Sequence, residues 1–100
     1  MTNQINKLQT EIKLLNKAAN ETQYNVQTKS EIKANIYNGK SLEIMESLLT
    51  ANVQRVVGMI TMLQLMDMEI EAYDLDAPEN TLSDLNSAIE RRQIKLAELK

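Results

Sequence analysis

The segment from Leu42 to Tyr73 constrains the fold most, because it holds nothing that stops a helix and is apolar around most of its circumference. It contains no proline, and Gly58 is its one weak helix former, at a cost of about 1 kcal/mol relative to alanine. A helix that is apolar nearly all round must be buried on several sides. We therefore expect the rest of the chain to cover part of this central helix and another chain to cover the remainder.

Apolar residues at helical spacing also mark the segments on either side. Those of the first segment follow steps of three and four and share one helix face: Ile5, Leu8, Ile12, Leu15 and Ala19. This narrow stripe is typical of a coiled-coil seam. The last segment has a similar stripe, formed by Leu82, Leu85, Ile89, Leu96 and Leu99.

Turn and cap residues predict where these helices begin and end. Asn38-Gly39 closes the first segment, with Gly39 suited to the left-handed position after a helix, and Ser41 is suited to cap the next helix. The stretch 77–80 breaks the pattern again, and either Asp76 or Thr81 fits the cap of the last helix. The predicted helices run from about 3–37, 42–73 and 81–99.

These elements predict one all-α domain over residues 1–100. We expect an elongated three-helix antiparallel hairpin or bundle of coiled-coil type, or four helices if a capping box at Thr28 and Glu31 kinks the first helix near residues 23–29. A helix over 42–73 would be about 48 Å long, whereas a compact chain of this length has a radius of gyration of about 13 Å. The domain should therefore be long and should oligomerise through its central helix.

Composition excludes most catalytic and metal chemistry. The chain has no cysteine and no histidine, which removes thiolate nucleophiles, imidazole bases and the commonest zinc ligands. Its two glycines stand apart, so no glycine-rich phosphate loop exists. We expect no catalytic residues, no cofactor and no metal, and hence a protein that is not an enzyme.

Charge and hydropathy exclude two classes of partner. A basic stripe with stacking aromatics, as nucleic-acid binding needs, is absent, and the net charge is −3. The most apolar run, 56–66, has 11 residues, whereas a membrane-spanning helix needs about 20. No secretory signal pattern begins the chain, so we expect a cytoplasmic protein that binds neither nucleic acid nor membrane.

The most unusual feature is a methionine-rich apolar face on the central helix. Met59, Met62 and Met66 follow i, i+3, i+7 spacing, and methionine suits surfaces that accept varied partners. The predicted interface comprises Val56, Met59, Ile60, Met62, Leu63, Met66 and Ile70. These side chains either form an adaptable groove for another protein's helix or fill the core of a homo-oligomer, a dimer or a tetramer.

Acidic residues gather just after this face, at Asp67, Glu69, Glu71, Asp74 and Asp76. They either form a docking surface or pair within the chain. An antiparallel hairpin of the first two helices would place Arg55 opposite Glu21 and Glu71 opposite Lys7. A small basic patch in the last helix, Arg91-Arg92 with Lys95, is interpreted as a solvated face.

The sequence thus favours a non-catalytic interaction module, such as an adaptor, chaperone or regulator. One alternative is a self-assembling structural subunit of a helical bundle. Another is a small acidic inhibitor of a host enzyme, from a virus or a mobile element.

Overall fold

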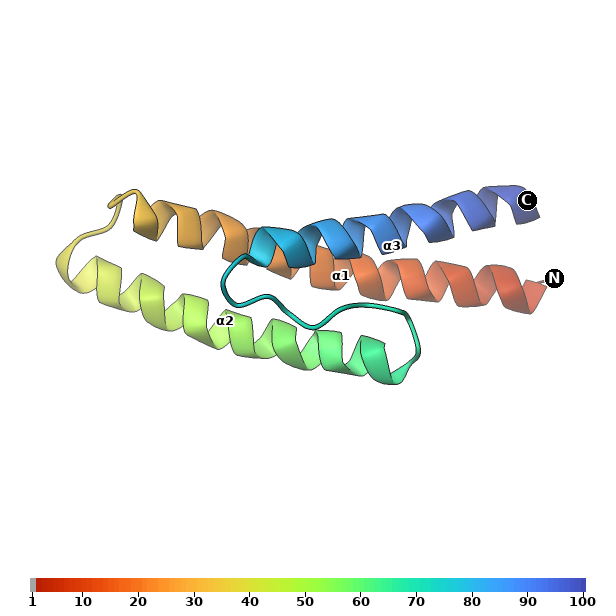
Figure 1. Cartoon of the computed structure of the whole chain (residues 1–100), viewed down its shortest axis with the longest axis horizontal. Helices are drawn as coiled ribbons and strands as arrows, with labels where there is room; N and C mark the ends of the chain where they lie inside the picture. Colours follow the sequence, from red (N-terminus) through yellow and green to blue (C-terminus); the bar gives the residue numbers. More distant parts are fainter. Residues whose placement is uncertain (1) are drawn as a thin grey trace.

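The computed structural model describes residues 2–100, apart from the side chain of Thr2, and consists of three long helices (Figure 1). They are α1 (Thr2–Lys33), α2 (Gly39–Leu65) and α3 (Pro78–Leu99). The molecule measures 56 × 22 × 18 Å with a radius of gyration of 15.8 Å, compared with about 13 Å for a compact chain of this length. The predicted all-α, elongated three-helix fold is confirmed.

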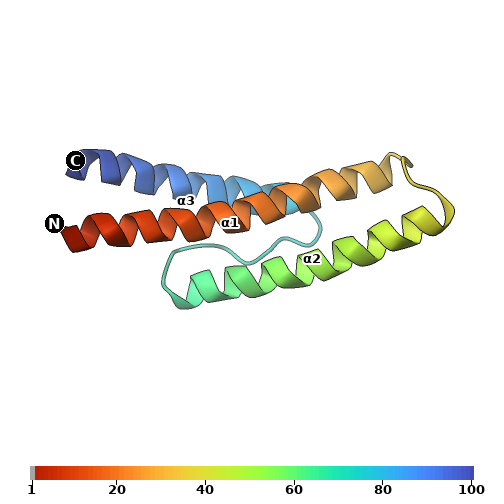
Figure 2. The same ribbon diagram turned by 180° about the vertical axis from the view of Figure 1, so that it is seen from behind.

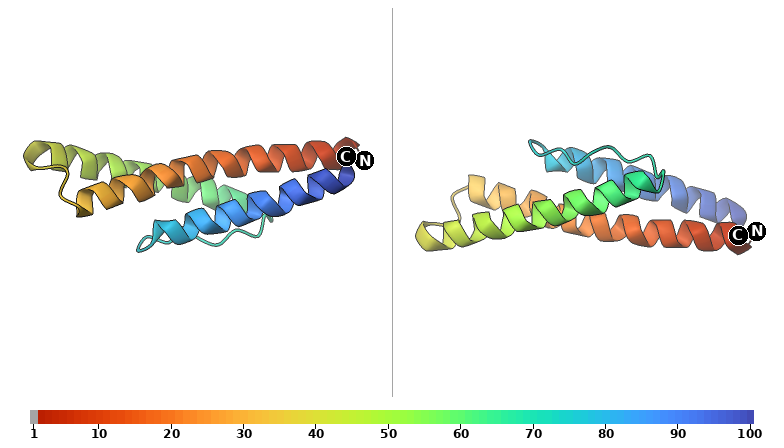
Figure 3. Two further views of the ribbon diagram at one scale, coloured as in Figure 1. Left: turned by 90° about the horizontal axis from the view of Figure 1, so that it is seen from above. Right: turned by 90° about the horizontal axis from the view of Figure 1, so that it is seen from below.

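Helix α1 lies in the middle of the molecule and packs against both other helices (Figure 2). Both α2 and α3 run antiparallel to α1, so the two ends of the chain lie side by side. Within the described residues, α2 and α3 do not pack directly against each other. The segment 66–77, called the linker below, returns along the molecule between them (Figures 1 and 3).

Helix α1 is continuous and ends earlier than predicted, at Lys33. Asn35 adopts a left-handed φ of 59°, its N–H donates to the carbonyl of Ile32, and the N–H of Ile36 donates to that of Glu31. This is the Schellman pattern, with Asn35 in the position predicted for Gly39. Gly39 instead begins α2 with a φ of 53°, so Ser41 is not its cap.

Helix α2 ends at Leu65, eight residues before the predicted end. The N–H of Asp67 donates to the carbonyl of Gln64, and that of Met68 donates to Leu63, with Asp67 at a φ of 57°. This second Schellman ending brings the buried side chains of Met68 and Leu63 together, the apolar contact that accompanies the motif. The chain turns back here because the linker's apolar residues fill the space beside α3.

Helix α3 begins three residues earlier than predicted, with Pro78 in its first turn. The Asp74 carboxylate accepts hydrogen bonds from the N–H groups of Asp76 and Ala77, and Thr81 Oγ1 accepts one from the N–H of Asp74. Asp74 therefore organises the start of α3, in place of the predicted caps Asp76 and Thr81. Hydrogen bonds from Ala77, and then from Asn80, lower the pKa of Asp74.

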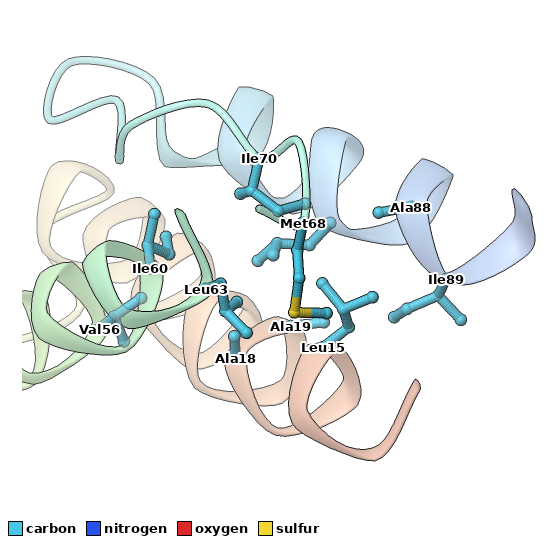
Figure 4. Close-up of a cluster of buried hydrophobic side chains, with 11 residues drawn as sticks. Leu15, Ala18, Ala19, Val56, Ile60, Leu63, Met68, Ile70, Ala88 and Ile89 are labelled. Atoms are coloured by element: carbon cyan, nitrogen blue, oxygen red, sulfur yellow. The ribbon is translucent and has the colours of Figure 1, made fainter. Parts of the chain in front are cut away.

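The core lies at the middle of the molecule, where all three helices and the linker overlap (Figure 4). Its side chains come from every element: Leu15, Ala18, Ala19, Val56, Ile60, Leu63, Met68, Ile70, Leu85, Ala88 and Ile89. Met68 of the linker points toward Leu15 and Ala19 of α1. The core is therefore completed by an irregular segment in place of a fourth helix.

Candidate interaction surface

Four of the seven side chains predicted to form a partner interface are buried in the core. Val56, Ile60 and Leu63 are at most 1% exposed, and Ile70 is buried in the linker itself. The prediction assumed a continuous helix whose apolar circumference exceeds what one chain can cover. Because α2 ends early, the chain's own residues bury these four, and they present no surface to a partner in this conformation.

The methionines of the predicted interface do reach the surface. Met62 is 47% exposed and Met66 46%, while Met59 is half-buried against the edge of the core. Two further apolar residues of α2, Ile44 at 53% and Leu48 at 49%, are exposed in the same way. Neither of these two residues belongs to the predicted interface.

These residues form one stripe along α2. Together with Ala51 and Arg55 they follow steps of four, three, four, four, three and four residues, which keep all seven on one helix face. The α2 stripe consists of Ile44, Leu48, Ala51, Arg55, Met59, Met62 and Met66. The stripe lies on the flank of α2 next to α1, because Leu48, Ala51 and Arg55 line a hollow together with Glu21 and Tyr24. Figure 3, in the view from below, shows α2 in front of α1 and α3.

Helix α2 is almost free of charge along most of its length. Between Ser47 and Met66, Arg55 is the single charged residue. Soluble proteins normally carry many charges on an exposed helix face, whereas the cores of protein interfaces are depleted in them. Leu65, which is 81% exposed beside the α2 stripe, extends this apolar surface.

Two shallow hollows lie where the stripe meets α1. The first is open and lined by Glu21, Tyr24, Leu48, Ala51, Asn52 and Arg55. The second lies at the other end of the stripe and is lined by Asn3, Asn6, Lys7, Thr10, Glu11 and Met66. The α2 stripe and α1 thus form the two sides of a surface that a further helix could contact.

A chain of polar contacts fixes α2 beside α1 next to the first hollow. Arg55 donates to Glu21 at 2.6 Å, which confirms the predicted pairing of these two residues. Arg55 also donates to Asn52, whose amide donates to Asn25, and Asn25 donates to the hydroxyl of Tyr73 at 3.2 Å. Burial raises the pKa of Tyr73, so the hydroxyl stays neutral in this contact.

The acidic residues lie along the linker and have different local roles. Asp67 ends α2, Asp74 organises the start of α3, and Glu71 lies beside α3, where its N–H donates to Asp84. The predicted pairing of Glu71 with Lys7 is therefore wrong, because α2 ends before residue 71.

The two remaining acids lie in the exposed part of the linker. Glu69 adopts a left-handed φ of 53° and is exposed, and Asp76 is also exposed. Lys29 donates to the backbone carbonyls of Leu75 and Asp76, at 3.2 and 2.7 Å, and ties this part of the linker to α1.

Arg92 has a structural role that the sequence interpretation missed. Its guanidinium donates to the carboxylate of Glu11 at 3.1 Å and to the carbonyls of Ala88 and Met68. Both partners of the ion pair are largely buried, with side chains 16% and 14% exposed. A solvated patch was expected here, but a pairing between residues 81 positions apart leaves no local pattern.

Residues 2–100 contain no group of three acidic side chains placed to hold a metal ion. None of the helices in that range is long and apolar enough to cross a membrane.

Comparisons of the chain with protein-family models, curated proteins and solved structures gave no match.

Proposed function

We propose that this chain is a non-catalytic protein–protein interaction module that binds a helix of its partner along the α2 stripe. The observation that carries the proposal is the combination of half-exposed apolar side chains along the α2 stripe and the near-absence of charge between Ser47 and Met66. Water-facing helices rarely keep such a face unless another surface covers it.

The role of the methionines follows from their position at one end of this surface. Met62 and Met66 are exposed at the C-terminal end of α2, next to the hollow beside α1. Unbranched, polarisable side chains adapt to different contours, so this end suits an imperfectly matched partner helix. The revised interface keeps Met59, Met62 and Met66 and replaces the buried residues with Ile44 and Leu48.

Affinity capture with charged variants tests the proposal. Leu48→Glu and Met62→Glu each place a charge on the α2 stripe at a half-exposed position, so the fold should tolerate them. Ile94→Glu is the matched control, because Ile94 is a comparably exposed apolar residue on α3. We expect stripe variants with unchanged circular dichroism to lose bound chains that the wild type and control retain. Equal capture by all four would refute the interface.

A further inference from the structure

We propose that the occupant of the α2 stripe is a second copy of this chain, docked antiparallel about a two-fold axis at Arg55. This inference rests on the proposed function, because it names the partner of the same surface. It is carried by the symmetry of the stripe, by the sizes of its side chains and by the placement of its charges.

The stripe has the same spacing in both directions from Arg55. Its members lie 4, 7 and 11 positions before this residue and 4, 7 and 11 positions after it. In an antiparallel pair centred there, every apolar member of one helix meets an apolar member of the other. A two-fold interface needs this property, since the same patch must complement itself.

Side-chain size favours the antiparallel over the parallel arrangement. The antiparallel pair places Ala51 opposite Met59, and two facing helices pack well when large side chains meet small ones. A parallel pair in register would place Met59 against its own copy and Ala51 against its own copy. The first contact is crowded and the second leaves a gap. Antiparallel helices also oppose their macrodipoles favourably.

The charges at the centre of the surface are balanced within each copy. Arg55 is the one charge of α2 between Ser47 and Met66, and Glu21 of α1 lies against it at 2.6 Å. Their side chains remain 62% and 28% exposed. Because Glu21 already neutralises Arg55, a second copy brings two arginines and two glutamates to the axis with no net charge.

The hairpin of α1 and α2 gives the second copy two helices to contact. Tyr24 of α1 is 42% exposed and lines the same hollow as Leu48 and Ala51. Two such hairpins related by the axis would form a four-helix bundle around the stripes. The linker meets α2 at Val57 and Thr61, outside the stripe, and α3 packs against α1.

Mass in solution and paired charge substitutions test the contact. Light scattering should give twice the 11.4 kDa chain mass for the wild type. Leu48→Glu or Met62→Lys alone should raise the dimer dissociation constant about 100-fold or more, because each buries two unpaired charges. The double variant Leu48→Glu/Met62→Lys should restore the dimer, because position 48 faces position 62 of the second copy. In a parallel pair the same double variant would stay dissociated.

Disulfide trapping tests the orientation directly, because the chain has no cysteine of its own. When Ala51→Cys and Met59→Cys chains are mixed and oxidised, we expect the mixed 51–59 dimer to dominate. Like positions would lie about 12 Å apart along the axis, too far for a disulfide. Ser87→Cys, at an exposed position of α3, should not cross-link. Dominant 51–51 and 59–59 dimers would overturn the antiparallel arrangement.

The outcomes also separate this inference from the proposed function. A wild type that stays monomeric at all concentrations, yet captures another chain in a stripe-dependent manner, overturns the second copy and leaves the interaction module standing. A monomer without stripe-dependent capture overturns both. A dimer that persists unchanged in Leu48→Glu places self-association on another face and overturns the inference.

Discussion

The side-chain amide of Asn52 donates to the side-chain oxygen of Asn25, and this buried contact joins the middle of α2 to α1. Along these helices it lies between the core residues Ala19 and Val56 and the hairpin turn at residues 34–38. Asn25 reaches on to Tyr73 of the linker, so three segments of the chain meet through this pair. A polar pair at such a position favours one alignment of two helices over shifted ones.

Removing one member of this pair should lower the free energy of unfolding by more than the net contribution of the hydrogen bond itself. Asn52→Leu leaves the Asn25 oxygen buried without a donor, and we expect the free energy of unfolding to fall by about 1–3 kcal/mol. Asn25→Leu should cost a similar amount. The double variant should cost clearly less than the sum, because neither asparagine is left buried without the other. Urea unfolding of the four chains measures the coupling, with exposed Gln23→Leu as the control. Strict additivity would contradict this interpretation.

The linker side chain Met68 should contribute to stability as a core residue does. It is fully buried among side chains of α1, α2 and α3. Met68→Ala should lower the free energy of unfolding by about 2–4 kcal/mol, from lost burial and the cavity left behind. Leu75→Ala in the same linker is the control, because Leu75 is 67% exposed and its truncation should change little. Similar losses for the two variants in denaturant unfolding would show that Met68 is not a core residue.

The two glycines should respond to alanine in opposite directions. A Cβ at Gly58 meets nothing within 4 Å, so Gly58→Ala should stabilise α2 by about 0.5–1 kcal/mol through helix propensity. Gly39 has a φ of 53°, so Gly39→Ala should destabilise the chain by about 1 kcal/mol despite equally open space. Thermal unfolding at a concentration where the wild type is monomeric measures both. A loss of stability in the Gly58 variant would contradict the prediction.

Periodicity alone predicted the three helices, the antiparallel hairpin and the pairing of Arg55 with Glu21, because these follow from apolar spacing and helix geometry. The ends of α1 and α2 were predicted less well. Each ends with a left-handed residue that is not glycine, Asn35 in one case and Asp67 in the other. Since Asp is an ordinary residue inside a helix pattern, the sequence of α2 continues to look helical where the backbone has already turned.

The error at the end of α2 then determined which side chains were assigned to the interface. A helix continued to residue 73 keeps its apolar circumference unpaired, whereas the observed linker folds Met68 and Ile70 onto it. Burial of Val56, Ile60 and Leu63 thus depends on a tertiary contact that no local pattern reveals. The heptad-like spacing of the α2 stripe was present in the sequence and identifies the exposed face once the core side is known.

The start of α3 should become less stable in acid through Asp74. Its pKa is lowered in the folded chain, chiefly by the hydrogen bond from the N–H of Ala77 and then by that from Asn80. A carboxylate with a lowered pKa stabilises the fold above its unfolded pKa of about 3.9, and this contribution is lost as the pH falls through the folded value. The wild type should therefore lose stability below about pH 4 relative to Asp74→Asn, which cannot be protonated.

The stability difference between these two chains, measured by urea unfolding from pH 6 to pH 2, checks the assignment. Asp76→Asn is the matched control, because Asp76 contacts Lys29 through its backbone carbonyl. We expect the difference between wild type and Asp74→Asn to shrink as the pH falls, while the curve of Asp76→Asn stays parallel to that of the wild type. If the difference for Asp74→Asn is constant across this range, the charge of the Asp74 carboxylate does not stabilise the start of α3.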